Sequence, residues 1–375
     1  MEKNDLADSR RKIVISGINI FQAGALTIYY ELLDCLVENN YWKDNDITLF
    51  VHSVELFSKY TCYFTIIECP KARRSYLYRL FYEYVYFFFY SIGKKIDIWL
   101  SLHDMTPNVI AKNRFVYCHN PLPFVSNDVN DYLHYGHKNK LVQKLYGVIY
   151  GINIKKNSAV IVQQEWLRRE FRSRYGVKNV IVARPSQGID YSGDEIKRET
   201  PGIYTFIYAS YPRDFKNFEV ICEAAEILCR YGLHFAVALT LNGTENEYAR
   251  KLVDKYGSIP AIDWKGILDK KELQSEYEKA DCLIFPSLLE TWGLPITEFI
   301  EFSKEILCSD LPYAYETVGN YPKKRFFNPM DPTDLADKMM DLIMGKTVHD
   351  DSKVVELTGQ VCESWSDLLD IIIIS

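Results

Sequence analysis

The sequence lacks the marks of exported and zinc-binding proteins. Its charged start, residues 2–12, is followed only by the apolar segment IVISG (13–17), which is too short for the core of a signal peptide. The nine cysteines form no C-x-x-C pair and no His/Cys spacing typical of a zinc site. We therefore expect a cytoplasmic protein with reduced thiols.

Common nucleotide and catalytic motifs are also absent. No G-x-G-x-x-G follows an expected strand, which argues against a dehydrogenase, and there is no G-x-S-x-G elbow. GKT (345–347) imitates the end of a P-loop, but Met340 stands where the first glycine is required. DND (44–46) fits a D-x-D metal motif but lies in a polar turn. We interpret it as a turn, and expect neither a metal nor another cofactor.

Length and charge suggest how the chain is organised. Its 375 residues are too many for one ordinary core, and 48% hydrophobic content is typical of a folded protein with two domains. Residues 1–200 carry 27 Lys and Arg against 21 Asp and Glu, whereas 201–375 carry 17 against 29. The basic half suits an anionic acceptor or a membrane, or is simply solvated surface. No nucleic-acid partner is expected.

Short apolar runs alternate with helical patterns in both halves. Expected strands are 12–17, 47–52, 96–102, 114–119, 158–163, 204–210, 234–240, 262–268, 281–287 and 305–310. Expected helices are 26–39, after a loop at 18–25, then 218–232, 247–257, 270–280 and 295–304. The periodic signal stops around 183–202, which we interpret as a linker. This α/β alternation predicts two doubly wound, Rossmann-like domains, residues 1–198 and 199–350.

The segment ETWGLPITE (290–298) follows an apolar run and holds two glutamates around a Gly-Leu-Pro turn. Pro295 suits the first helical position, so the amides of Gly293 and Leu294 can hold phosphate oxygens at the helix start. Glu298, one turn into the helix, can accept both hydroxyl protons of a ribose. Alternatively, Glu290 is a loop charge and Glu298 complements the helix dipole.

Around this motif the chain resembles the retaining glycosyltransferases of family 4. The resemblance rests on segments 241–248, 263–273, 280–301, 309–320 and 326–339, covers residues 203–345, and is looser over 12–200. It implies the GT-B fold, in which two Rossmann-like domains face each other across a cleft. It also implies that a final helix, about 359–375, crosses back to the first domain.

The resemblance also implies roles for single residues. Glu298 would bind the nucleotide ribose and Glu290 the donor sugar, while Arg213 and Lys216 would neutralise the leaving diphosphate. The other donor-binding residues would be Gly24, Gly243, Thr291, Trp292, Gly293 and Leu294. On the acceptor side, His119 ends an expected strand beside the reacting sugar, and His103 is the second choice. The alternatives are solvated loop cations, turn glycines and structural histidines.

The implied reaction transfers a sugar from a nucleotide diphosphate donor to an acceptor hydroxyl with retention of anomeric configuration. Its partners would be the nucleotide sugar and a glycan or lipid-linked acceptor, in polysaccharide or lipopolysaccharide assembly. The alternatives are a sugar-nucleotide epimerase, a phosphorylase of the same architecture, or a non-catalytic protein that binds sugar nucleotides or membranes.

An aromatic segment, YLYRLFYEYVYFFFY (76–90), has basic residues on both sides within 71–95. It is too short, and too interrupted by Arg79 and Glu83, to span a bilayer. It is either a helix packed on the first sheet or a helix at a membrane interface. The second alternative would place the protein at the inner face of the membrane, near a lipid-linked acceptor.

Overall fold

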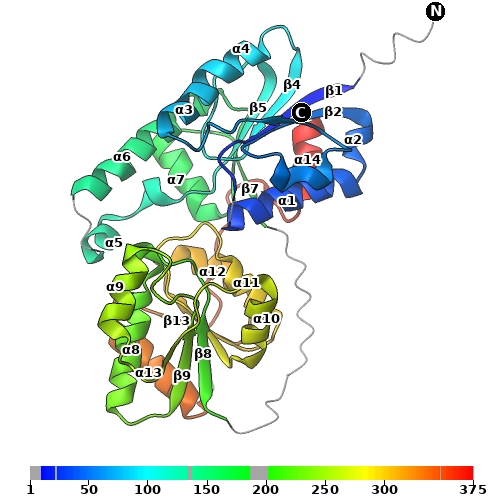
Figure 1. Cartoon of the computed structure of the whole chain (residues 1–375). Coiled ribbons are helices and arrows are strands. Elements are labelled where there is room, and N and C mark those ends of the chain that lie inside the picture. Colours follow the sequence, from blue (N-terminus) through cyan, green and yellow to red (C-terminus); the bar gives the residue numbers. More distant parts are fainter. Residues whose placement is uncertain (1–9, 22, 134–136, 186–201, 347, 375) are drawn as a thin grey trace, which may run out of the picture. The chain divides into compact units, whose positions relative to one another are not determined.

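The computed structural model of the chain describes residues 10–21, 23–133, 137–185, 202–346 and 348–374. The chain forms two compact units (Figure 1). The first contains residues 1–124, 137–187 and 356–375, and the second contains 125–136 and 188–355. Residues 186–201, which hold most of the predicted linker and the predicted domain boundary, lie outside the described residues.

The first unit is built on a parallel sheet of eight strands. In spatial order these are β14 (Val361–Cys362), β7 (Val180–Ala183), β6 (Ala159–Val162), β5 (Ala111–Tyr117), β4 (Ile96–Ser101), β1 (Arg11–Gly17), β2 (Asn45–Val51) and β3 (Thr65–Glu68). Strands β6 and β7 are entirely buried, because helices cover both faces of a parallel sheet. The strand order reverses between β1 and β4, which makes that gap the switch point of the sheet.

Helices of this unit cover the sheet in two layers. They are α1 (Ala23–Glu38), α2 (Tyr41–Asp44), α3 (Tyr76–Phe81), α4 (Phe87–Ser91), α6 (His137–Gly151), α7 (Glu165–Tyr175) and α14 (Trp365–Ile374), with shorter turns η2 (Glu55–Tyr60), η3 (Tyr82–Tyr86), η4 (Leu122–Phe124) and η5 (Ile154–Lys156). Helix α1 begins earlier than predicted. Gly24, expected in a loop, therefore lies in the first turn of that helix.

The C-terminal segment returns to the first unit, as predicted. Strand β14 pairs in parallel with β7, and helix α14 packs against α1. The buried side chains of Leu368, Leu369 and Ile372 share one hydrophobic core with α1 and the sheet. Burial of these side chains, rather than any special loop, holds the end of the chain in place.

The second unit has a parallel sheet of six strands. Their order is β10 (Ile262–Trp264), β9 (Phe235–Leu239), β8 (Tyr204–Tyr208), β11 (Cys282–Phe285), β12 (Glu305–Ser309) and β13 (Lys324–Phe327). Its helices are α5 (Asn127–Tyr132), η6 (Asp214–Lys216), α8 (Phe218–Arg230), α9 (Glu247–Tyr256), α10 (Lys270–Lys279), α11 (Leu294–Ile300), α12 (Pro312–Val318) and α13 (Pro332–Ile343). The switch point lies between β8 and β11. Both units are therefore doubly wound, as predicted.

Leu368→Ala tests the anchoring of the C-terminal helix. Leu368 is fully buried, so its truncation should lower the free energy of unfolding of the first unit by about 2–5 kcal/mol. Urea unfolding followed by circular dichroism measures the change. Val354→Ala, at a side chain that is 93% exposed in the second unit, is the control. Equal effects of the two substitutions would contradict the packing described for α14.

Candidate functional site

The candidate site of the second unit lies where its sheet changes direction. Strands β8 and β11 pair in parallel, with Phe206 opposite Cys282 and Ile207 opposite Leu283. Their carboxyl ends point the same way, so the loops that follow them, 209–217 and 286–293, are neighbours. This edge of an open α/β sheet is where such sheets bind ligands.

Hydrogen bonds join these two loops directly. The Leu288 amide donates to the Phe215 carbonyl at 2.8 Å, and the Ser287 hydroxyl donates to the same carbonyl at 3.3 Å. The buried Asn217, in a left-handed conformation with φ of 58°, donates its side-chain amide to the Pro286 carbonyl at 3.2 Å. The loops are thereby held in one fixed register.

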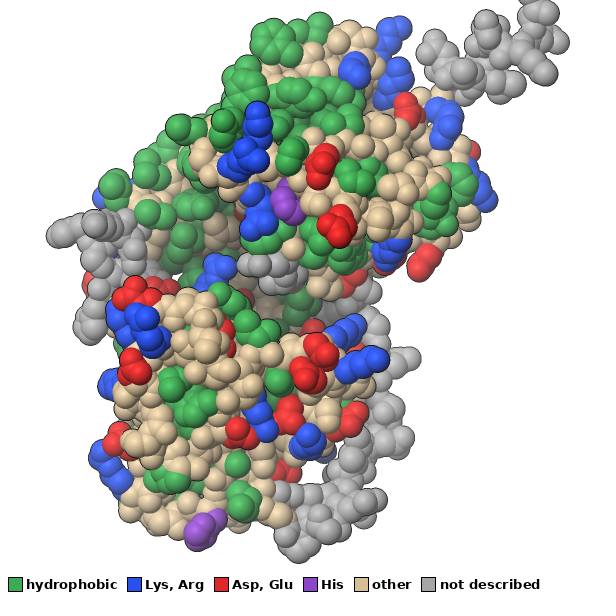
Figure 2. Space-filling model, viewed as in Figure 1, with side chains coloured by type: hydrophobic (Ala, Val, Ile, Leu, Met, Phe, Trp, Pro, Cys, Tyr) green, Lys and Arg blue, Asp and Glu red, His purple; other side chains and the backbone are tan. Residues whose placement is uncertain are grey.

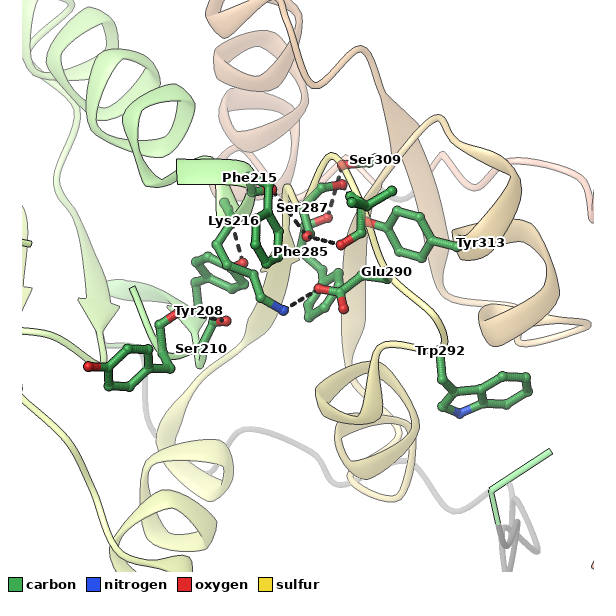
Figure 3. A network of polar contacts seen from close by, with 12 residues as sticks. Tyr208, Ser210, Phe215, Lys216, Phe285, Ser287, Glu290, Trp292, Ser309 and Tyr313 are labelled. Atoms are coloured by element: carbon green, nitrogen blue, oxygen red, sulfur yellow. Dashed lines mark hydrogen bonds and ion pairs between the residues drawn. The ribbon is translucent and has the colours of Figure 1, made fainter. Parts of the chain in front are cut away.

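This register brings Lys216 and Glu290 together. Lys216 Nζ lies 2.5 Å from Glu290 Oε1, although 74 residues separate them in sequence. The side chains are 18% and 12% exposed, so the pair is largely shielded from water. Figure 3 shows the Lys216 side chain reaching toward Glu290, while the Tyr208 hydroxyl donates to the Lys216 carbonyl at 3.0 Å. Two residues predicted for the site thus meet at its centre.

Two buried tyrosines surround this ion pair. Burial, and after it the charge of Glu290, raises the pKa of Tyr208 and of Tyr313 well above the ordinary value of a phenol. The Tyr313 hydroxyl donates to the Ser287 carbonyl at 2.7 Å, which fixes the loop before Glu290. The pair therefore lies in surroundings of low polarity, where electrostatic interactions are stronger than in water.

The turn after Glu290 depends on glycine. Gly293 has φ of 95° and ψ of 58°, and a Cβ atom there would lie 3.3 Å from both Ile296 Cδ1 and Phe285 Cε1. Helix α11 begins at Leu294, so Pro295 occupies the second helical position, one later than predicted. A side chain at position 293 would be strained by its backbone and crowded by its neighbours.

The remaining residues of the motif differ in exposure. Glu298 is exposed and accepts a hydrogen bond of 3.4 Å from the Tyr277 hydroxyl. Although the residue as a whole is exposed, protein around its carboxyl group raises the pKa of Glu298 by desolvation. Thr291 is half-buried, whereas Trp292 is buried and its indole ring points away from the Lys216–Glu290 pair (Figure 3). The Trp292 side chain therefore supports the turn from inside the core.

Two further predicted residues lie outside this pair. Arg213 is exposed, and its guanidinium lies 6.0 Å from the centre of the Tyr211 ring. Gly243 has φ of 93°, which suits glycine, and its amide donates to Glu245 Oε2 at 3.0 Å. The Gly243 amide is therefore already hydrogen-bonded to a carboxylate of the same loop, that of Glu245.

In the first unit, the two candidate histidines have different surroundings. His103 is buried near the β1/β4 switch point, and its ring nitrogens contact the Ser16 carbonyl, at 2.9 Å, and the carboxylate of the buried Glu83. His119 follows β5, and its Nε2 has no hydrogen-bond partner among the described residues. Of the two, only His119 has a ring nitrogen that is buried without a partner among the described residues.

Desolvation lowers the pKa of His119 to about 4, although the nearby charge of Asp104 partly opposes this shift. Its imidazole is therefore neutral at pH 7 and can accept a hydrogen bond. Asp104 also fixes the strand end, because its Oδ1 accepts the amides of His119 at 2.6 Å and Asn120 at 3.0 Å.

Several residues that support the two candidate regions are not indicated by the sequence, namely Asp104, Glu83, Asn217 and Tyr313. His103 is predicted as a histidine candidate, whereas the left-handed Asp104 beside it, with φ of 73°, gives no distinct local signal. Asn217 and Tyr313 act through hydrogen bonds to loop carbonyls distant in sequence, at Pro286 and Ser287, so no local pattern identifies them.

Within the described residues, no group of His, Cys, Asp and Glu side chains is arranged to hold a metal ion. The turn predicted at DND (44–46) is wrong, because Asp44 ends helix α2 and strand β2 begins directly at Asn45. The same part of the chain contains no helix of the length and apolar character needed to cross a membrane.

Part of the chain matches a known family. Residues 193–353 match the family described as glycosyl transferases group 1. This segment contains Lys216, Glu290, Gly293 and Glu298, and thus the whole candidate site of the second unit.

Two curated relatives are mannosyltransferases by name. The chain is 28% identical over 191 residues to the serotype-specific mannosyltransferase WbdA of Escherichia coli, a match covering 48% of this chain and 23% of WbdA. It is 22% identical over 234 residues to the O-antigen chain mannosyltransferase RfbU of Salmonella typhimurium strain LT2, covering 59% of this chain and 63% of RfbU. The match spans less than two thirds of either relative.

Solved structures confirm the predicted GT-B fold class. The crystal structure of a glycosyltransferase from Rickettsia africae ESF-5 has a TM-score of 0.63 to this chain. The two are 13% identical, and the match covers 97% of this chain and 93% of the other. Likeness at this identity concerns the fold, which consists of two Rossmann-like domains.

Gly293→Ala tests the turn before α11. The alanine substitution should lower the free energy of unfolding of the second unit by about 1–3 kcal/mol, because the backbone at position 293 is left-handed and the added Cβ would crowd Phe285 and Ile296. Gly147→Ala is the control, because position 147 lies within helix α6 and its nearest neighbour would be Tyr175 Oη at 3.7 Å. There alanine should be neutral or stabilising. A neutral Gly293→Ala variant would contradict the strained turn.

The lowered pKa of His119 makes the first unit sensitive to acid. Between pH 6.5 and about 4 the unfolded chain holds a proton on this ring that the folded chain does not, so stability falls as pH falls through this window. Over it, the wild type should lose up to about 3 kcal/mol more unfolding free energy than His119→Gln. Urea unfolding at pH 6.5 and at about pH 4 measures this loss of unfolding free energy in each protein.

His234→Gln, at an exposed histidine of the second unit, is the matched control and should behave as the wild type. If His119→Gln also loses as much stability as the wild type, His119 is not the group whose protonation is suppressed by folding.

Proposed function

We propose that this chain is a glycosyltransferase that moves a sugar from a nucleotide diphosphate donor to an acceptor hydroxyl, with retention of anomeric configuration. One observation carries the proposal: the shielded Lys216–Glu290 pair lies at the β8/β11 switch point, inside the segment that matches the glycosyl transferases group 1 family. The resemblance to retaining family 4 enzymes supports the stereochemical part.

On the donor side, we assign the phosphates to the turn around Gly293 and Leu294. The left-handed Gly293 keeps a side chain out of this turn, so backbone amides can approach phosphate oxygens. Glu298, exposed on helix α11, would accept hydrogen bonds from the ribose hydroxyls, and the half-buried Thr291 would contact the donor. Gly24, at the start of α1, is the proposed contribution of the first unit.

Catalysis would be mainly electrostatic. Negative charge develops on the leaving diphosphate as the glycosidic bond breaks, and the ammonium of Lys216 would stabilise it in surroundings of low polarity. Arg213, on the same loop, would add a second cation. Glu290 would position the donor sugar, and its hydrogen bond with Lys216 would orient both side chains. Because these cations supply the charge, we propose that no metal ion is required.

The acceptor side is assigned to the first unit. The neutral His119 ring, whose buried Nε2 has no hydrogen-bond partner among the described residues, would orient the sugar or the acceptor hydroxyl. His103, whose nitrogens are engaged by Ser16 and Glu83, would serve as internal support. The names of WbdA and RfbU favour mannose as the donor sugar, and that of RfbU favours surface polysaccharide assembly as the setting. The resemblance to family 4 is the basis for proposing a cytoplasmic reaction with a glycan or lipid-linked acceptor.

Two substitutions separate donor binding from chemistry. Glu298→Ala should weaken binding of the nucleoside diphosphate by about tenfold to a hundredfold, since it removes charged hydrogen bonds to the ribose. Lys216→Ala should lower kcat by about a hundredfold to a thousandfold with a smaller effect on binding. Thermal shifts with UDP-, GDP- and dTDP-sugars, GDP-mannose included, identify the donor; calorimetry and product analysis then compare the variants.

Lys271→Ala, at an exposed lysine of the same unit, is the control and should change neither quantity. Addition of a chelator should leave the rate unchanged. The proposal fails if no sugar nucleotide stabilises the protein, or if the donor is converted equally with and without an acceptor, as an epimerase would do.

A further inference from the structure

The aromatic segment 76–91 has its charged residues on the inside. It forms α3, the π-helical turn η3 and α4 in succession. Arg79 is buried and donates to the His103 carbonyl at 2.6 Å. Glu83, one turn later and also buried, contacts the His103 ring, and its backbone carbonyl accepts the Asn108 amide at 2.9 Å. These contacts fix which side of the helix faces the sheet.

With its charges turned inward, the outer side of this helix is apolar. Leu77, Phe81, Val85 and Phe89 are all exposed, with Leu77 at 77% and Phe89 at 66%. They recur every four residues, and the wider i→i+5 repeat of the π-helical turn helps to keep this spacing on one side. A surface helix of a soluble protein usually shows the opposite arrangement, with charged residues facing solvent and apolar residues facing the core.

Helix α6 of the same unit carries a second exposed apolar stripe. Leu141, Leu145 and Val148 are spaced as one helical face, Ile152 follows directly after the helix, and Val148 is 67% exposed. The two helices are neighbours, because the rings of Tyr76 and Tyr146 lie 6.2 Å apart in an edge-on arrangement. In Figure 2, hydrophobic side chains gather over this part of the first unit. We call the two stripes together the apolar surface.

The charges around the apolar surface are of one sign. Within residues 69–96 the only acidic residue is the buried Glu83, whereas the exposed charged residues are Lys71, Arg73, Arg74, Lys94 and Lys95. None of these five forms an ion pair with a described residue. Residues 132–164, which include α6, contain five lysines and no Asp or Glu. A partner for this surface must therefore offer an apolar region together with negative charges that contact the surrounding lysines and arginines.

We propose that the apolar surface docks on a lipid bilayer with anionic headgroups. Aliphatic and aromatic side chains would enter the boundary of the acyl region, and the surrounding lysines and arginines would contact the headgroups. The tyrosines at its edge, Tyr76 and Tyr78, suit the interface between the two. A second copy of the chain fits less well, because association through this surface would bring two basic rims together. The inference goes beyond sugar transfer and does not depend on it.

Vesicle binding by the full chain tests the proposal. The wild type should co-sediment with phosphatidylcholine vesicles in proportion to their phosphatidylglycerol content, and salt should weaken this binding. The double variants Leu77→Glu/Phe89→Glu and Leu145→Glu/Val148→Glu should each reduce binding at least about tenfold. Val354→Glu, which places the same charge on an exposed apolar residue of the second unit, should bind as the wild type.

Circular dichroism and the midpoint of thermal unfolding show whether each variant remains folded. Lys94→Glu/Lys95→Glu, which keeps the apolar surface intact, gives a second route and should abolish the dependence on phosphatidylglycerol. The proposal is overturned if the wild type stays in solution with anionic vesicles. It is equally overturned if folded double variants bind as the wild type, or if they only convert a dimer into a monomer in light scattering without changing vesicle binding.

Discussion

The parallel pairing of β8 with β11 is the constraint on which the candidate site depends. It brings together the loops 209–217 and 286–293, which are far apart in sequence, and it places them at the switch point of the sheet. The Leu288–Phe215 bond and the Asn217 side chain then lock the loops together. The Lys216–Glu290 pair follows from this register, so a change in strand pairing would separate the two charges.

In the first unit, one helix has two different roles on its two sides. Its inner side holds His103 through Arg79 and Glu83 at the end of β4, and its outer side is left without charge. Burying a charge is costly unless it is paired or hydrogen-bonded, and here Arg79 donates to the His103 carbonyl while Glu83 contacts the His103 ring. The apolar surface is thus a direct consequence of how the unit satisfies its buried charges.

Much of the fold could be predicted from the sequence because its elements repeat a clear pattern. The helices α8, α9 and α10 begin at the predicted residues, β9 is a continuous apolar run, and β4 and β8 are apolar runs interrupted by single polar residues. Strands β3 (TIIE), β7 (VIVA), β13 (KRFF) and β14 (VC) are not among the predicted strands. All four are short; β3 and β13 also carry charged residues, and β13 buries Lys324 and Arg325 through carbonyl contacts that only the folded chain provides. The motif around Gly293 was recognisable locally, whereas the 2.5 Å contact of Glu290 with Lys216 required the strand order.

The most direct test of this account is a crystal structure of the protein with a bound nucleoside diphosphate. The account predicts the diphosphate at the turn of Gly293 and Leu294, within reach of Lys216, and the ribose hydroxyls on the Glu298 carboxylate. A nucleotide bound away from the β8/β11 edge, with Lys216 and Glu290 still paired only to each other, would contradict it.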